Sequence, residues 1–155
     1  MHARFLQQAI ELASANVSSG EGGPYGAVIV KDNRVIAASA NQVTRSLDPT
    51  AHAEVLAIRQ ACHILNDFQL SGCTLYSSCE PCPMCLGAIY WARLDRVYFA
   101  CSREDAASAG FDDSFIYNEI SVAPPQRRIA MLQWELENAC LPFELWNRKA
   151  DKVPY

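Results

Sequence analysis

The sequence predicts an α/β fold built on a mixed β-sheet. Short apolar segments bounded by turns alternate with longer segments of helical periodicity. The segments 27–30 and 35–39 are separated only by the polar turn 31–34, which is typical of an antiparallel hairpin. The apolar segment 96–100 follows a helix, so it is expected to pair in parallel with the strand at 74–76.

The first half of the chain is predicted to contain two helices and the hairpin. Phe5, Ala9, Leu12, Ala13 and Val17 recur at helical spacing and predict an amphipathic opening helix, which the glycine-rich segment 20–24 ends. A second helix is expected from Ala51, with Thr50 as its N-cap. Its buried face is predicted to hold Val55, Ile58, Cys62 and Leu65, and His63 lies off that face.

The second half continues the alternation. A helix from Pro83 to about Leu94 is apolar nearly all round, so we expect a subunit interface to cover what the sheet leaves exposed. A short helical stretch is expected within 110–117, a break at Pro124-Pro125, a fifth strand at 129–134 and a last helix from Pro142. No repeat and no long linker interrupts the chain, so residues 1–155 are predicted to form one domain.

Composition narrows the class of function. The formal net charge is −4 and no cluster of lysine and arginine stands out, which argues against a polynucleotide partner. The longest apolar run, Leu86 to Ala92, is too short to cross a bilayer. No signal-peptide pattern opens the chain, and most of the seven cysteines stand among apolar residues. We therefore expect a cytoplasmic protein without membrane contact.

His52, Cys82 and Cys85 are the candidate metal ligands. Zinc prefers thiolate sulfur and imidazole nitrogen, and three protein ligands plus water is the pattern of a catalytic site. Cys82 and Cys85 are three residues apart at a predicted helix start, so both face one side. Alone, a Cys-x-x-Cys pair also fits a redox pair or half of a structural zinc site. Cys79 leaves open a fourth ligand, although a small buried residue at a strand end is favoured there.

Glu54 is the candidate proton carrier. Two residues apart on a helix is about 200° of rotation, so His52 and Glu54 reach one point only beyond the N-terminal end of their helix. The site is therefore expected between two helix starts, at Ala51 and at Pro83. There, zinc would polarise a water molecule and Glu54 would take its proton and pass it to a leaving nitrogen.

Four stretches together resemble the cytidine-deaminase superfamily of zinc hydrolases, and within it the bacterial guanine deaminases. They are GGPYGAVIV (22–30), DPTAHAE (48–54), SCEPCPMCLGAIYWAR (78–93) and GFDDSFIY (110–117). The zinc motifs identify the superfamily, and the last stretch and the terminal tyrosine narrow it. Tyr25 departs from the usual phenylalanine and brings a hydroxyl near the expected pocket wall.

The resemblance implies a fold, a reaction and a site. The fold is three-layer α/β/α, with a five-stranded mixed sheet and helices on both faces. The reaction is hydrolysis of guanine to xanthine and ammonia. His52, Cys82 and Cys85 would bind Zn²⁺, and Glu54 and Asp113 would move protons. Asn41, Ala53 and Tyr155 would contact the purine. A homodimer that exchanges C-terminal segments of about residues 140–155 is also implied, with Tyr155 completing the partner's pocket.

Other functions share the same motifs. Deamination of guanosine, cytosine or another small base or nucleoside would use identical zinc chemistry. Editing of adenosine in tRNA is a further alternative, which the acidic net charge disfavours. A structural zinc module, with Cys79 closing the site, would give Glu54 no role.

Overall fold

The computed structural model describes residues 2–155 and divides into two compact units. The first ends at Asp113, and the second comprises Ser114–Tyr155. Each unit is described by itself. The prediction of a single domain over residues 1–155 stays a prediction.

A mixed sheet of four strands forms the centre of the first unit. The strands are β1 (Gly26–Lys31), β2 (Arg34–Ala40), β3 (Cys73–Cys79) and β4 (Arg96–Cys101), in the order β2-β1-β3-β4. The pairs β1–β2 and β1–β3 are antiparallel, and β3–β4 is parallel, which confirms the hairpin and the parallel pair. Asp32 and Asn33 turn the hairpin with φ of 48° and 64°, the conformation of the turn type that suits two-residue hairpins.

The predicted fifth strand is wrong. Residues 129–134 have no regular structure, and Ile129 and Trp134 are 79% and 84% exposed. This segment belongs to the second unit, whose described residues contain no strand with which it pairs. Strand propensity reflects packing against neighbours, so an apolar run without a partner strand does not become one.

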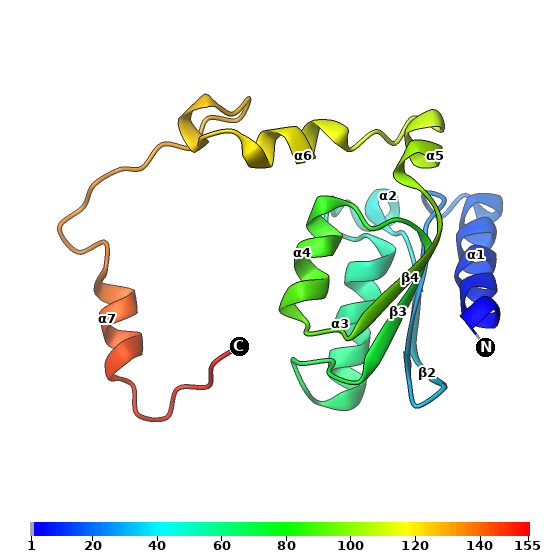
Figure 1. The fold of residues 1–155 in the computed structure, drawn as a ribbon, viewed down its shortest axis with the longest axis horizontal. Coiled ribbons are helices and arrows are strands. Elements are labelled where there is room, and N and C mark those ends of the chain that lie inside the picture. The colour runs from blue at the N-terminus through cyan, green and yellow to red at the C-terminus, as the bar shows by residue number, and fades with distance from the viewer. Residues whose placement is uncertain (1) are drawn as a thin grey trace. The chain divides into compact units, whose positions relative to one another are not determined.

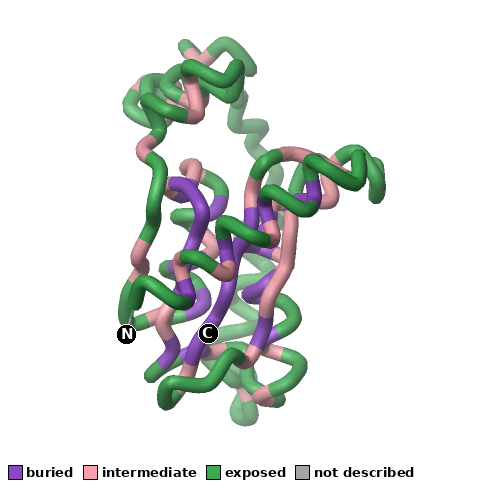
Figure 2. Tube along the Cα trace, turned by 90° about the vertical axis from the view of Figure 1, so that its right-hand side faces the viewer, coloured by how far each residue is buried: buried purple, intermediate pink, exposed green. Residues whose placement is uncertain are grey.

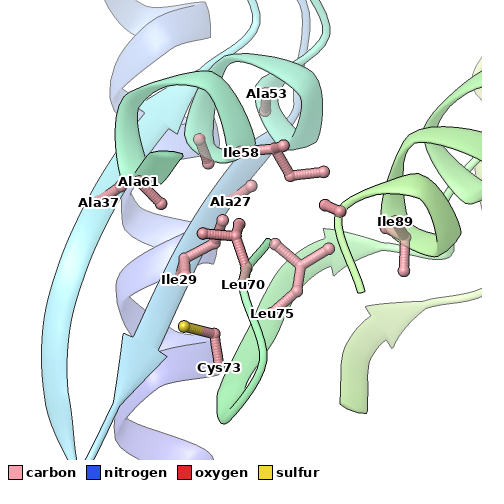
Figure 3. Close-up of a cluster of buried hydrophobic side chains, with 12 residues drawn as sticks. Ala27, Ile29, Ala37, Ala53, Ile58, Ala61, Leu70, Cys73, Leu75 and Ile89 are labelled. Carbon is pink, nitrogen blue, oxygen red and sulfur yellow. The ribbon is translucent and has the colours of Figure 1, made fainter. Parts of the chain in front are cut away.

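Helices cover both faces of this sheet, as predicted (Figure 1). Helix α1 (His2–Ser19) packs on one face, against Val28, Val30 and Tyr76. Helices α3 (Ala53–Leu65) and α4 (Pro83–Trp91) cover the other face. The main core lies beneath them and is shown in Figure 3. It includes Ala27, Ile29, Ala37, Ala53, Ile58, Ala61, Leu70, Cys73, Leu75 and Ile89.

Two details of the helices differ from the sequence expectation. Asn16 takes the buried position in the last turns of α1, and Val17 is 52% exposed. Helix α3 begins two residues later than expected, with His52 and not Thr50 as its N-cap. The Thr50 hydroxyl instead donates to Asp48 Oδ1 at 2.7 Å, within a local turn.

The helix that starts at Pro83 ends at Trp91, earlier than predicted. Arg93 has a φ of 58°, a left-handed conformation that α-helices do not continue through. Only Cys85 and Ile89 of α4 are buried, while Met84, Leu86, Tyr90 and Trp91 are exposed. Two short helices, α2 (Val43–Ser46) and α5 (Arg103–Ser108), were not anticipated.

The second unit consists of α6 (Ser114–Ser121), a 3₁₀ turn η1 (Pro124–Gln126) and α7 (Leu141–Arg148). None of its residues is buried, whereas buried residues run through the sheet of the first unit (Figure 2). An apolar hollow of about 370 Å³ lies between α6 and the segment that follows η1. Among the described residues, no helix has the length and apolar character that crossing a bilayer requires.

The contact between α1 and β1 leaves no room for a side chain at Gly26. A Cβ built there would lie 2.2 Å from the carbonyl oxygen of Ala9 and 2.9 Å from the amide nitrogen of Ala13. We expect Gly26→Ala to lower the free energy of unfolding by about 1–3 kcal/mol, the cost of overpacking. Urea unfolding followed by circular dichroism measures this change. The matched control is Gly87→Ala, because a Cβ at Gly87 meets nothing within 4 Å. Equal unfolding midpoints for the two variants would contradict the close packing of α1 on the sheet.

Candidate active site

His52 is the N-cap of α3 and Cys82 is the N-cap of α4, and their side chains meet where the two helices begin. Each has an extended backbone, with φ and ψ of −70° and 151° for His52 and −66° and 169° for Cys82. Both side chains therefore lie beyond a helix start, as the spacing of His52 and Glu54 predicts. Cys85 reaches the same point from the first turn of α4, and its sulfur is fully buried.

The three side chains are placed to bind one metal ion. Their ligand atoms all lie within 4.8 Å of one another. The sulfurs of Cys82 and Cys85 are each 3.5 Å from His52 Nδ1. In a tetrahedral zinc site, bond lengths of about 2.3 Å to sulfur and 2.0–2.1 Å to nitrogen separate the two ligand atoms by about 3.6 Å. The observed separations therefore fit zinc, with Nδ1 of His52 as the ligand atom.

The protein groups alone already favour an anionic sulfur at this point. A hydrogen bond from Cys85 and a further one from His52 lower the pKa of the Cys82 thiol to about 4. The hydrogen bond with Cys82 raises the pKa of the Cys85 thiol, and burial raises it further. The hydrogen bond with Cys82 also raises the pKa of His52. Such a cluster holds protons that a divalent cation displaces, because zinc binds thiolates and neutral imidazole.

Glu54 lies against this cluster in the first turn of α3. Its side chain is 4% exposed, and burial raises the pKa of its carboxyl. Ser77 donates a hydrogen bond to Oε1 at 3.1 Å. The other oxygen, Oε2, is 3.5 Å from the sulfur of Cys85. Glu54 therefore presents one oxygen to the sheet and the other to the metal ligands.

Cys79 is not part of the ligand cluster. Its thiol donates to the carbonyl of Ser102 at 3.4 Å, and burial is the main cause that raises its pKa to about 11. The ligand atoms that lie within 4.8 Å of one another belong to His52, Cys82 and Cys85, and the sulfur of Cys79 is not among them. The cluster of three therefore keeps the fourth position that a catalytic site needs.

Asn41 and Ala53 lie near the same end of the sheet. Asn41 directly follows β2 and is buried, and its Oδ1 accepts from the amide of Val43 at 3.2 Å. The buried amide of Asn16 donates to the carbonyls of Asn41 and Gly23, both at 2.8 Å. Ala53, the first residue of α3, is fully buried between His52 and Glu54.

Asp113 and Tyr25 belong to the electrostatic surroundings of the site. Burial and the negative charge of Cys82 raise the pKa of Asp113. The pKa of Tyr25 is raised to about 12 by burial and then by Cys79, Glu54 and Asp113, so its hydroxyl stays a hydrogen-bond donor. The Tyr25 ring meets Phe111 edge to face, with centroids 5.3 Å apart. Tyr155 is in the second unit and is exposed, so its part in the pocket stays a prediction.

Comparison with known proteins places this geometry in a family. Residues 1–101 match the family described as cytidine and deoxycytidylate deaminase zinc-binding region. The chain belongs to this family. The predicted zinc-dependent aminohydrolase is thereby confirmed, with zinc as its cofactor.

Relatives within this deaminase family narrow the resemblance. Guanine deaminase of Bacillus subtilis is 55% identical over 154 residues, 99% of each chain. Its crystal structure superposes with a TM-score of 0.98 and covers 100% of this chain and 99% of its own. The guanine deaminase of Nitrosomonas europaea is 32% identical, with a TM-score of 0.66 over 70% of this chain and 63% of its own. The tRNA-specific adenosine deaminase of Aquifex aeolicus is 45% identical over 96 residues, 62% of this chain and 63% of its own. The predicted resemblance to guanine deaminases is confirmed.

Two polar residues of the site were missed from the sequence. Asn16 stands at the last buried position of an otherwise apolar helix face, and Ser77 stands inside a buried strand. In both cases a polar residue occupies a position where the pattern expects an apolar one. A buried polar group needs a hydrogen-bond partner, so such positions were the available signal.

The cluster predicts how zinc responds to single cysteine changes. Purified protein is expected to hold about one zinc per chain, because one three-ligand site is present. Cys82→Ala and Cys85→Ala should each lose most of the metal, whereas Cys79→Ala should keep it. Metal analysis of dialysed protein measures the content. Loss of zinc from Cys79→Ala to the extent seen in Cys82→Ala would show that the site is closed by a fourth cysteine.

Proposed function

We propose that this protein hydrolyses guanine to xanthine and ammonia. The proposal depends on one observation: the geometry of the candidate site agrees with the activity of a relative that matches nearly the whole chain. A cluster fit for catalytic zinc lies beside a buried carboxylate, in a chain 55% identical to a guanine deaminase over nearly its whole length. Zinc hydrolases of this type replace an amino group by oxygen without any other cofactor.

In this proposal His52, Cys82 and Cys85 would hold the zinc, which when bound would lower the pKa of a water molecule and make it a nucleophile. Glu54 takes the proton of the water through Oε2, the oxygen near Cys85. Glu54 gives this proton to the ring nitrogen. It then takes the remaining proton of the hydroxyl that has added to the purine carbon and gives it to the amine, so that the C–N bond breaks and ammonia leaves. Burial raises the pKa of Glu54, which suits a group that must both accept and donate a proton.

The purine is held by groups around this centre. Asn41 orients the base through its side-chain amide, which the hydrogen bond from Asn16 to its backbone keeps in place. Ala53, which precedes Glu54 at the start of α3, contacts the purine in this proposal. Asp113 assists proton transfer, and burial raises the pKa of its carboxyl, which makes the carboxyl easier to protonate. The partner is a small molecule, and a cytoplasmic location stays part of the proposal.

The test is ammonia release from guanine, guanosine, cytosine, cytidine, adenine and ammeline, measured on zinc-loaded protein. Guanine should be the best substrate and should exceed guanosine clearly, because a closed pocket excludes ribose. Glu54→Gln is the matched control, since it keeps the shape but cannot carry the proton in the same way. Its turnover should fall by at least about 100-fold with zinc retained. Equal turnover of guanosine and guanine would favour a nucleoside deaminase. Near-normal turnover by Glu54→Gln would show that Glu54 does not carry the proton.

Two apolar surfaces support a homodimer in which the C-terminal segment is exchanged. The second unit buries none of its residues and exposes Leu132, Trp134 and Phe143 among others. Its hollow is lined by Phe115, Ile116, Glu119, Ile120, Arg127, Arg128, Ile129 and Met131. Helix α4 of the first unit also exposes Tyr90 and Trp91. Apolar area of this kind marks protein–protein contact, and a second copy of the chain would cover both surfaces.

The exchanged tail gives a prediction for subunit mixing. Deleting residues 153–155 should leave folding and zinc content intact and sharply reduce guanine turnover, because Tyr155 no longer covers the purine and excludes water. Mixing this protein with Glu54→Gln, under conditions that let subunits reassort, should restore activity. Each mixed dimer then holds one site with an intact Glu54 and an intact tail from its partner. Full activity of the truncated protein would show that Tyr155 does not cover the pocket. Lack of recovery in proven heterodimers would show that each tail covers the pocket of its own chain.

A further inference from the structure

Ser77 is a polar residue in the middle of a buried strand. It lies on β3 with Ala27 of β1 and Phe99 of β4 as its register partners. It is 1% exposed and shares its face of the sheet with Cys73 and Leu75 of the main core. An apolar residue would satisfy this position without a hydrogen bond, so the hydroxyl calls for an explanation.

The partner of this hydroxyl is the carboxylate of Glu54. Ser77 Oγ donates to Oε1 at 3.1 Å, and both residues are buried. The opposite oxygen, Oε2, lies 3.5 Å from the sulfur of Cys85. One oxygen is therefore fixed to the sheet, and this leaves the other directed at the centre between His52, Cys82 and Cys85.

A glutamate side chain has three rotatable bonds, and its carboxylate must be held to work as a proton carrier. Glu54 stands in the first turn of α3, where the side chain can turn toward the helix end or along its flank. General acid–base catalysis needs the carboxylate within hydrogen-bond reach of the proton that it moves. The strand supplies that restraint from the side opposite the reaction.

We propose that Ser77 is a positioning residue, which holds Oε1 of Glu54 so that Oε2 stays aimed at the metal centre. This inference rests on the proposed function, because it gives Glu54 the proton-carrying role. Ser77 itself does not touch the substrate. It acts on turnover through Glu54 and leaves the binding of zinc and of purine to other residues.

The first test compares Ser77→Thr with Ser77→Val, which have the same shape and differ in the hydroxyl. The valine variant should lose about 10–100-fold in kcat relative to the threonine variant, the rate equivalent of one hydrogen bond to a charged group. KM for guanine and zinc content should differ little between the two. Comparing these two variants with each other removes any common effect of the added methyl groups on packing. Equal kcat values for threonine and valine would overturn the proposal.

A second comparison separates positioning from general damage to the strand. Ser78→Ala removes a hydroxyl from the next residue, which is 5% exposed and accepts instead from the amide of Gly26 at 3.0 Å. Ser77→Ala should reduce kcat well beyond Ser78→Ala. In a Glu54→Gln background, Ser77→Ala should reduce kcat little further, because the effects of two residues that act as one unit are not additive. An undiminished further loss in that background would show that Ser77 acts by another route.

The position of the carboxylate can also be observed without any turnover. A crystal structure of Ser77→Val should show Glu54 rotated or in more than one rotamer, and that of Ser77→Thr should show it as here. Glu54 unmoved in the valine variant would overturn the proposal. Activity of the wild-type protein on guanine is measured in parallel. Its absence would refute the proposed function, whereas these structures still decide whether Ser77 positions Glu54.

Discussion

The site depends on two helices that begin at one point. His52 caps α3 and Cys82 caps α4, and each backbone is extended where its helix starts. A helix start concentrates unpaired amide donors and partial positive charge, which stabilises a thiolate. The same arrangement puts Glu54 and Cys85 in the two first turns, so the proposed proton carrier and a candidate ligand lie beside the cap residues. The sheet, the core and the helix packing all serve to hold these two starts together.

Much of this could be predicted because it follows from local chemistry. The hairpin and the parallel pair were predicted from the order of apolar segments, turn and helix, and the ligand set and the meeting of two helix starts from residue spacing. The start of α3 was misplaced because threonine is a stronger intrinsic N-cap than histidine, and Thr50 instead pairs with Asp48. Ser77 and Asn16 were missed because their partners lie 23 and 25 residues away in the chain. The fifth strand was expected from the apolar run 129–134 and from the family resemblance, and neither specifies a pairing partner within this chain.

The chain divides at Asp113 into a unit with a packed core and a unit without buried residues. Up to that residue the protein holds every predicted metal ligand and proton carrier, in a packed core. Beyond it no residue is buried, and many large apolar side chains are exposed, so this part forms no core of its own. The Aquifex aeolicus tRNA-specific adenosine deaminase matches 96 residues of this chain, whereas the Bacillus subtilis guanine deaminase matches 154. The region that the family model matches, residues 1–101, lies within the first unit.

The convergence of the two helix starts also makes the metal a structural tie. Its ligands come from α3 and α4, which are thirty residues apart in sequence at His52 and Cys82. An unfolded chain does not hold these three side chains together, so the free energy of zinc binding adds to the free energy of folding. Removing zinc would then loosen the tertiary contact between α3 and α4 as well as stop turnover. Zinc bound at this point would therefore stabilise the folded chain in addition to supplying its chemistry.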